Sequence, residues 1–251
     1  MKKIIWIDIG THFGQEHSSI FYSNYSFYSR IIRRFLGAKV LKRGKFVSFN
    51  GLKNIIHARS KIRKRSKEFY TVFVEANPKI AYKKNFYPAT DMFFNLALTS
   101  DSHTPVSIAK LYIGDGGELA EGNSLFSEKH NSHNGRHIAT FGVSASNFFS
   151  ALRSYLNEKF GDYDVLLRIN CEGVEDDAIY SAYSSFGNKL KLICGSLKDV
   201  EELKGLEASQ KLDTFISDNK LLFVKFSSGI YSWPKAHAAV LNMLEKKDER
   251  L

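Results

Sequence analysis

The residues nearest the start of the chain that could do chemistry follow a short apolar run. Residues 4–7 are Ile-Ile-Trp-Ile, Asp8 comes next, and Gly10 and Gly14 stand four positions apart. Glycine has no Cβ, so it lets a backbone approach a ligand closely. The free N–H groups of a following helix point at the same place. A buried strand, a carboxylate and a glycine turn together predict one wall of a nucleotide-type crevice.

A second carboxylate ends the next predicted strand. Residues 70–74 are β-branched and aromatic, and Glu75 follows them. An acid at the tip of the second strand of a doubly wound sheet binds the ribose hydroxyls of a nucleotide, and a carboxylate offers two acceptor oxygens. The usual gap from the glycine turn to this acid is about 20 residues, whereas Gly14 and Glu75 are 61 residues apart. An insertion of about 40 residues between core elements is usually functional.

This insertion, at about residues 24–68, holds the positive charge of the chain. The net charge is +10, with 36 Lys or Arg against 26 Asp or Glu. From Arg30 to Lys67 there are 14 basic residues and no acid, which leaves 22 basic and 26 acidic residues elsewhere. Three interpretations stay open: a solvated cover over the sheet edge, a surface for an anionic glycan, nucleotide sugar or nucleic acid, and a contact with an anionic membrane surface.

Strand and helix patterns alternate along the chain, which predicts an α/β fold with a parallel or mostly parallel sheet and helices on both faces. Strands are expected at residues 4–9, 70–75, 93–98, 106–113, 164–170, 190–194 and 221–226. Helices are expected at residues 15–22, 52–67, 145–160, 176–184, 197–217 and 234–245. Inside the insertion, the spacing predicts a further helix at 30–36 and a hairpin at 39–49.

Two further motifs fall at the ends of predicted strands. One is Asn95-Leu96-Ala97-Leu98, and the other runs from Ile169 through Asn170, Cys171, Glu172, Gly173 and Val174 to Glu175. Ligands of open α/β sheets bind outside the carboxyl ends of the strands. We therefore expect all four motifs to meet at one edge of the sheet.

The four motifs, in this order, resemble class I S-adenosylmethionine-dependent methyltransferases and, more narrowly, the FkbM family. Residues 8–14 match that family's Asp-x-Gly-x-x-x-Gly, and residues 75–78 are similar to its Glu-Pro-Asn-Pro-like motif. Residues 95–98 match Asn-x-Ala-Leu, and residues 169–175 resemble Ile-Asp-x-Glu-Gly-x-Glu. The resemblance covers about two-thirds of the chain. It departs at Asn170, where the family has Asp, and at Ala76, where it has Pro.

The resemblance implies a Rossmann-like methyltransferase sheet, mostly parallel with an antiparallel last strand, in a single domain over residues 1–251 with the basic insertion after the first helix. It implies S-adenosylmethionine as cofactor and O-methylation of a sugar or glycan hydroxyl. The residues implied for cofactor binding are Asp8, Gly10, His12, Gly14, Glu16, Glu75, Asn77, Asn95 and Asn170. Glu172 is implied to lie where the sulfonium methyl faces the acceptor, and Glu175 is favoured as a structural acid in the first turn of a helix.

Residues 114–136 have many glycines and polar residues and no periodicity, which predicts a long substrate loop or lid. A hydroxyl acceptor would be helped by a general base. The candidates are His12, His103, His130, His133 and His137, with His133 and His137 favoured. A solvated loop is the alternative, and no metal site is expected because the histidine spacing is not that of a zinc site. We expect specificity to lie in this loop and in the basic insertion.

Two other functions stay open. One is a methyltransferase acting on RNA or another polyanion, which the segment from Arg30 to Lys67 alone supports. The other is a non-catalytic binding protein on a methyltransferase scaffold, which the departure at Asn170 supports. Cys171 and Cys194 lie in apolar runs and are expected to be buried thiols in a reducing compartment. No apolar run is long enough for a signal peptide or a membrane span, so we expect a cytoplasmic protein.

Overall fold

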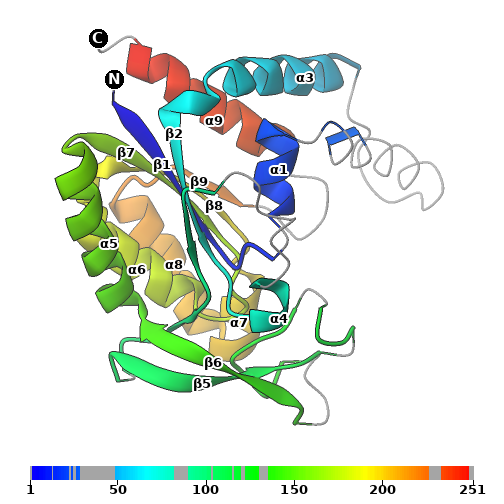
Figure 1. Ribbon diagram of the computed structural model, residues 1–251, viewed down its shortest axis with the longest axis vertical. Helices are drawn as coiled ribbons and strands as arrows, with labels where there is room; N and C mark the ends of the chain where they lie inside the picture. The colour runs from blue at the N-terminus through cyan, green and yellow to red at the C-terminus, as the bar shows by residue number, and fades with distance from the viewer. Residues whose placement is uncertain are drawn as a thin grey trace.

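The main sheet is made of parallel strands, and its four central strands are buried along most of their length. The computed structural model describes residues 2–12, 14–22, 24, 27–28, 49–81, 90–102, 104–114, 116–119, 122–129, 135–225 and 233–248. Within these ranges, six parallel strands pair in the order β3-β2-β1-β7-β8-β9, and Figure 1 shows helices beside this sheet. They are β1 (Lys3–Ile9), β2 (Phe69–Val74), β3 (Met92–Phe94), β7 (Tyr163–Ile169), β8 (Leu190–Gly195) and β9 (Phe223–Lys225). Every residue of β2 and β7 is buried, which is typical of a sheet covered on both faces.

The order of the strands reverses between β1 and β7. The chain first moves outward from β1 to β2 and β3, and it later returns to β7 beside β1 before moving outward through β8 and β9. The register pairs Ile9 at the end of β1 with Val74 on one side and with Ile169 on the other. A crevice forms outside the carboxyl ends of the strands at such a topological switch point.

Helices cover both faces, which confirms the α/β fold expected from the sequence. Because successive side chains of a strand point to opposite faces, Ile5 and Ile7 pack with α5 and α6, whereas Ile4 and Trp6 pack with α1, α3 and α9. The helices are α1 (Gln15–Phe21), α3 (Phe49–Lys64), α4 (Pro78–Ala81), α5 (Ala145–Phe160), α6 (Glu175–Phe186), α7 (Lys198–Lys204), α8 (Leu206–Asp218) and α9 (Trp233–Asp248). In the described ranges, no helix has the length and apolar content to cross a membrane.

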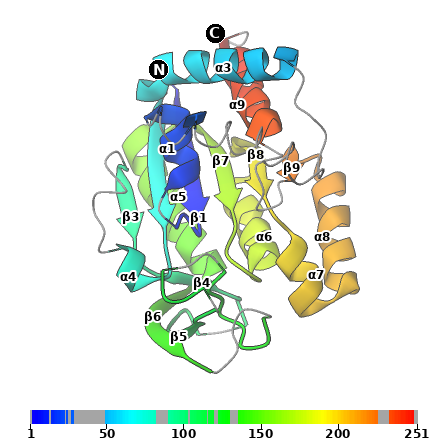
Figure 2. The same cartoon turned by 90° about the vertical axis from the view of Figure 1, so that its right-hand side faces the viewer.

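A second, smaller sheet lies beyond the carboxyl ends of the main strands (Figures 1 and 2). It contains β4 (Ala97–Thr99), β5 (Val106–Tyr112) and β6 (His137–Ser144) in the order β4-β6-β5, with β6 parallel to β4 and antiparallel to β5. The single strand expected at residues 93–98 is wrong, because the chain leaves the main sheet after Phe94 and enters this one at Ala97. Strand β6 was not predicted, and His137 begins it.

The antiparallel last strand implied by the resemblance is wrong for the described chain, because β9 pairs with β8 in parallel. Helices α7 and α8 connect β8 to β9. A helical crossover returns the chain to the amino end of the sheet, so the next strand runs parallel to the one before it. The single helix expected at residues 197–217 is also wrong. It is interrupted at Gly205, whose φ of 87° ends α7 and precedes α8.

The described part of the basic insertion lies at the amino end of the main sheet, where α3 packs against α9 and α1 (Figure 2). Lys61 forms an ion pair with Glu245 at 3.0 Å, and Lys3 at the start of β1 donates to the carbonyl oxygen of Lys67. The helix expected at residues 52–67 is confirmed, but it starts earlier, at Phe49, and ends earlier, at Lys64, before a short 3-10 helix at Ser66–Glu68. Phe49 begins this helix instead of ending a hairpin, and the rest of the hairpin and the helix at 30–36 lie outside the described residues.

Candidate functional site

The turn after β1 lies directly against the end of β7. Gly10 has a φ of 69°, and a Cβ at this position would lie 1.9 Å from the carbonyl oxygen of Asn170. The backbone N–H of Gly10 donates to Val74 at 2.9 Å, and that of Asn170 donates to Ile9 at 3.0 Å. The ends of β1, β2 and β7 are thus joined at the switch point, as the sequence predicts. Gly14 closes the turn in the left-handed conformation and caps α1.

Glu75 connects the loops that follow β1 and β2. Its side chain is buried, with Oε2 accepting the backbone N–H of His12 at 2.7 Å and Oε1 accepting that of Asn77 at 2.9 Å. Burial raises the pKa of this carboxyl, and the two N–H groups oppose that rise. Each carboxylate oxygen has a second lone pair. Glu75 can therefore accept hydrogen bonds from ribose hydroxyls through these second lone pairs, while it keeps its bonds to the backbone of His12 and Asn77.

The other polar residues predicted near the cofactor also join strand ends to loops. Asn95 Nδ2 donates to the carbonyl oxygen of Glu75 at 2.7 Å. Asn77 Oδ1 accepts the backbone N–H of Lys79 at 3.0 Å at the start of α4, and its Nδ2 donates to the carbonyl oxygen of Glu118. His12 Nε2 lies 3.0 Å from the carbonyl oxygen of Leu119. The loop at residues 116–119 is therefore held over the ends of β1 and β2.

Asp8 has a partner that the sequence analysis did not identify. It is fully buried, and its Oδ1 lies 3.0 Å from Nη1 of Arg168, its neighbour in the β1–β7 register. The same Nη1 donates to the carbonyl oxygen of Gly10 at 2.6 Å. The guanidinium group thus ties β7 to the glycine turn. The sequence signal for this contact was a single arginine among the apolar residues at 165–169, with an acid in the strand beside it.

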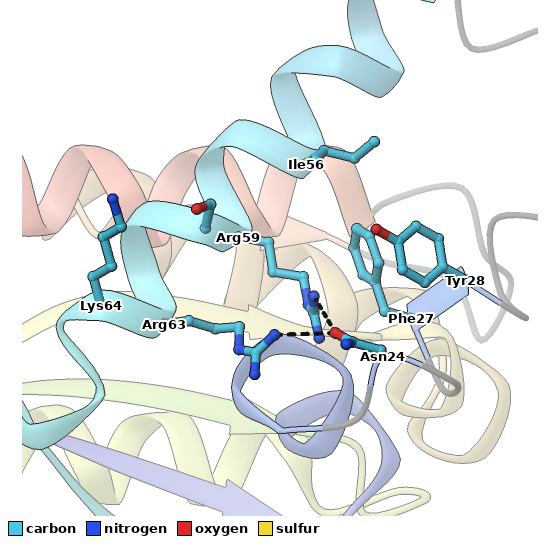
Figure 3. Close-up of a pocket in the computed structure, with 8 residues that line it drawn as sticks. Asn24, Phe27, Tyr28, Ile56, Arg59, Arg63 and Lys64 are labelled. Carbon is cyan, nitrogen blue, oxygen red and sulfur yellow. Dashed lines mark hydrogen bonds between the residues drawn. The ribbon is translucent and has the colours of Figure 1, made fainter.

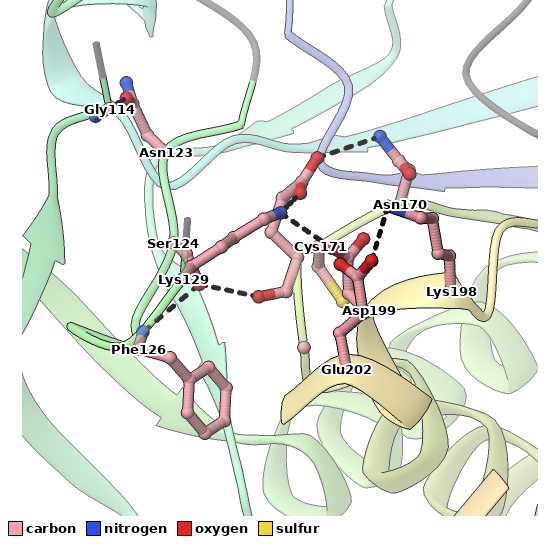
Figure 4. Close-up of polar contacts among 12 residues, drawn as sticks. Gly114, Asn123, Ser124, Phe126, Lys129, Asn170, Cys171, Lys198, Asp199 and Glu202 are labelled. Atoms are coloured by element: carbon pink, nitrogen blue, oxygen red, sulfur yellow. Dashed lines mark hydrogen bonds and ion pairs between the residues drawn. The ribbon is translucent and has the colours of Figure 1, made fainter. Parts of the chain in front are cut away.

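Glu172, predicted to be catalytic, lies in a cluster of ion pairs. Its carboxylate pairs with Lys129, and Nζ of Lys129 lies 2.9 Å from Oδ1 of Asp199; Figure 4 shows Lys129 and Asp199. Asn170 Nδ2 donates to Glu172 Oε1 at 3.4 Å, and Ser124 Oγ donates to its backbone carbonyl at 2.7 Å. Glu172 also has a φ of 62°, which is uncommon for a residue with a side chain. Lys129 and Asp199 were not predicted, because neither lies in a strand-end motif.

Glu175 has the structural role expected of an acid in the first helical turn. It is fully buried, with Oε1 accepting the backbone N–H groups of Cys171 and Glu172 at 3.0 and 2.7 Å. Oε2 accepts that of Gly173 at 2.8 Å. Burial, with a smaller effect of the nearby Asp199 charge, raises the pKa of the Glu175 carboxyl to about 7. The protonation state of Glu175 therefore changes near neutral pH, and with it the strength of its hydrogen bonds to the backbone that follows β7.

The stability of the protein is expected to fall as the pH rises from about 4.5 to 7. In this window the folded protein keeps the Glu175 proton, while the unfolded chain, with the ordinary pKa of 4.5, has lost it. Stability decreases with pH wherever the folded state binds more protons, by about 1.4 kcal/mol for each unit of pKa difference. Urea unfolding at pH 5 and pH 8 should show a smaller pH effect in Glu175→Gln. Glu207→Gln, at an exposed acid, is the control, and an unchanged pH effect in Glu175→Gln would contradict the assignment.

The histidines do not join this cluster in the described chain. His137 is exposed, its Nδ1 lies 3.0 Å from the carbonyl oxygen of Gly135, and its ring centroid is 5.8 Å from that of Tyr112. It is therefore in contact with the small sheet and not with Glu172. His103, His130 and His133 lie outside the described residues. Glu16 falls in the first turn of α1, and its side chain also lies outside the described part.

The two cysteines are free thiols in apolar surroundings. Burial raises the pKa of Cys194 to about 12 and that of Cys171 well above its ordinary value. Both thiols are therefore protonated at neutral pH and are poor nucleophiles. Among the residues that the structure describes, no three His, Cys, Asp or Glu side chains are grouped so that they could hold a metal ion.

Comparison of the chain with protein-family models, with curated proteins and with solved structures finds no match. The function is therefore inferred from the chemistry of the site and from the motifs of the sequence.

Proposed function

We propose that this chain is an S-adenosylmethionine-dependent methyltransferase that transfers a methyl group to a hydroxyl of a sugar or glycan. The main support is the Gly10 turn, which lies against Asn170 at the switch point with Glu75 at the neighbouring strand end. Numbered along the main sheet, the strand order is 3-2-1-4-5-6, which is the order of Rossmann-like folds. Such folds bind nucleotide-containing ligands at this place. The FkbM resemblance supports the cofactor and the acceptor class.

Two local features fit a bound cofactor at this edge. The side-chain hydroxyl of Thr11, in the glycine turn, is fully buried and has no hydrogen-bond partner among the described residues. A buried polar atom of this kind needs a ligand or a water molecule. Three non-glycine residues in the described ranges have a positive φ, and two of them flank the switch point. These two are His12 and Glu172. Backbone strain of this type gathers at functional sites.

The chemistry requires little from the protein beyond alignment. S-adenosylmethionine supplies an activated methyl group, so the chain has to place the acceptor oxygen in line with it and exclude water. We assign Gly10, Glu75 and Asn95 to holding the cofactor. Glu172 would accept a hydrogen bond from the acceptor hydroxyl, with Lys129 keeping its carboxylate in place.

Calorimetric titration with S-adenosylmethionine tests the cofactor assignment. The wild-type protein should bind it, and Glu75→Gln should bind it at least about tenfold more weakly, because the ribose hydroxyls lose an ionised acceptor. Glu207→Gln changes an exposed acid of α8 and should leave the affinity unchanged. Circular dichroism would verify that each variant is folded. Absence of binding to the folded wild-type protein, or equal affinities of the wild type and Glu75→Gln, would contradict the proposal.

A non-catalytic binding protein on the same fold is a second candidate. The pairing of Glu172 with Lys129 and the contacts of Glu75 with His12 and Asn77 favour it, because these carboxylates already have partners within the chain. Cofactor binding without methyl transfer to any sugar acceptor would support this candidate.

The alternative of an RNA methyltransferase relied on the basic insertion. The structure describes helix α3 of that insertion, and α3 lies at the other end of the main sheet from the proposed cofactor site.

A further inference from the structure

A pocket of about 540 Å³ lies beside α3 (Figure 3), and α3 lies at the opposite end of the main sheet from the proposed cofactor site (Figure 2). Arg59 and Arg63 of α3 line it together with Asn24 and Tyr28, which follow α1. Its volume is within the range of pockets that bind small molecules. The proposed methyltransferase activity does not use it, so any inference about this pocket is independent of that proposal.

Two guanidinium groups point to one oxygen in this pocket. Arg59 and Arg63 are one helical turn apart and thus share a face of α3. Nη1 of Arg59 and Nη1 of Arg63 donate to Oδ1 of Asn24 at 3.1 and 3.0 Å, as Figure 3 shows. An amide oxygen carries no net charge, whereas hydrogen bonds from guanidinium to an anionic oxygen are shorter and stronger. An anion at this point would be a better acceptor for both side chains than Asn24 is.

The Arg59 side chain is held rigidly for such a contact. It is only 6% exposed, and its guanidinium carbon lies 4.3 Å from the ring centroid of Phe27. Burial, followed by repulsion from Arg63, lowers the pKa of Arg59 below its ordinary value. Both effects would be relieved by a negative charge between the two side chains. The stacked guanidinium also has little rotational freedom to lose when a ligand binds.

The wall of the pocket indicates what the anion is attached to. Tyr28 is 48% exposed and Ile56 is 40% exposed, so an aromatic ring and an aliphatic chain face the solvent beside the two arginines. A planar ring can stack on an exposed tyrosine. We propose that this pocket binds a small organic phosphate of the nucleoside monophosphate type, with its phosphate displacing the Asn24 amide oxygen from between Arg59 and Arg63 and its planar ring against Tyr28.

Calorimetric titrations with adenosine monophosphate, ribose 5-phosphate, inorganic phosphate and adenosine test this proposal. Adenosine monophosphate should bind more tightly than either of the other two phosphates, and adenosine should bind most weakly. Arg63→Gln should weaken the binding of adenosine monophosphate at least about tenfold, and Arg63→Lys should have an intermediate effect, because lysine keeps the charge but loses the planar fork. Tyr28→Ala should weaken the binding of adenosine monophosphate by about fivefold and should leave the affinity for inorganic phosphate within about twofold of the wild-type value.

Lys53→Gln is the matched control, because Lys53 is an exposed cation of the same helix and does not line the pocket. It should leave the affinity for adenosine monophosphate within about twofold. Failure of the folded wild-type protein to bind any of the three phosphates at millimolar concentration would overturn the proposal. Equal losses in Lys53→Gln and Arg63→Gln would also overturn it. A single-stranded oligonucleotide could instead bind more tightly than adenosine monophosphate and lose equal affinity in Lys53→Gln and Arg63→Gln. That result would replace the proposed phosphate pocket with a polyanion-binding surface along α3.

Discussion

Replacing Arg168 with methionine is expected to lower the free energy of unfolding by about 3–5 kcal/mol. Arg168 and Asp8 are both buried in the main sheet, and Nη1 of Arg168 reaches Oδ1 of Asp8 at 3.0 Å and the carbonyl oxygen of Gly10 at 2.6 Å. Methionine fills much of the same volume but has no donor. The Asp8 carboxylate would lose this cation while staying in the core, where an ionised group without compensation is strongly unfavourable. Urea unfolding of the two proteins measures the difference.

Two further variants separate the buried charge from the lost packing. Lys198→Met removes the cation of an exposed ion pair with Glu202 and should change the free energy of unfolding by less than about 0.5 kcal/mol. The double variant Asp8→Asn, Arg168→Met should be more stable than Arg168→Met alone, because the uncompensated carboxylate is gone. A loss below about 1 kcal/mol in Arg168→Met would contradict the importance of the pair.

Replacing Gly10 with alanine is expected to destabilise the protein by more than about 3 kcal/mol and to abolish cofactor binding. Its φ of 69° is unfavourable for any residue with a Cβ, and the new Cβ would be placed 1.9 Å from the carbonyl oxygen of Asn170. The obstructing atom is backbone, and the N–H of the same residue donates to the carbonyl oxygen of Ile9 at the end of β1. Relief of the clash would therefore separate the ends of β1 and β7. Urea unfolding and titration with S-adenosylmethionine would report the two effects.

Gly135→Ala measures the cost of a side chain at positive φ without the steric clash that Gly10→Ala adds. Gly135 has a similar φ of 61°, and a Cβ there would have no atom within 4 Å. It should lower the free energy of unfolding by only about 1–2 kcal/mol. If Gly10→Ala were no more harmful than Gly135→Ala, the close approach of the β1 turn to β7 would not be essential. Cofactor binding that persists in Gly10→Ala would argue against the proposed site.

Much of the fold follows from patterns that neighbouring residues in the chain create. The mostly apolar segments at residues 4–9 and 165–169 predict buried parallel strands, and they lie in β1 and β7. The apolar spacing at residues 145–160 predicts α5 with its observed bounds. The glycine turn at Gly10 and the acid at Glu75 predict that two strand ends meet. These features depend on side-chain periodicity and on the backbone freedom of glycine, which act within a few residues.

The contacts within the site depended on tertiary structure. Asp8 is joined to Arg168, and Glu172 and Asp199 are both joined to Lys129, across tens of residues of chain, and no local pattern specifies such pairs. Glu172 was therefore predicted as a catalytic group without its partners. His137 was assigned to a loop, although the pairing with β5 makes it the first residue of β6.

The sequence by itself determined the alternation of strands and helices, the buried strand cores and the turn at Gly10. Only the tertiary structure decided that Ala97 leaves the main sheet, that β9 runs parallel to β8 and that α3 lies at the amino end, away from the switch point. Secondary structure follows from local sterics and periodicity, whereas sheet membership and helix position follow from which distant apolar faces are buried together. For this reason the basic charge of the insertion was evident from composition, while the place where it could meet a ligand was not.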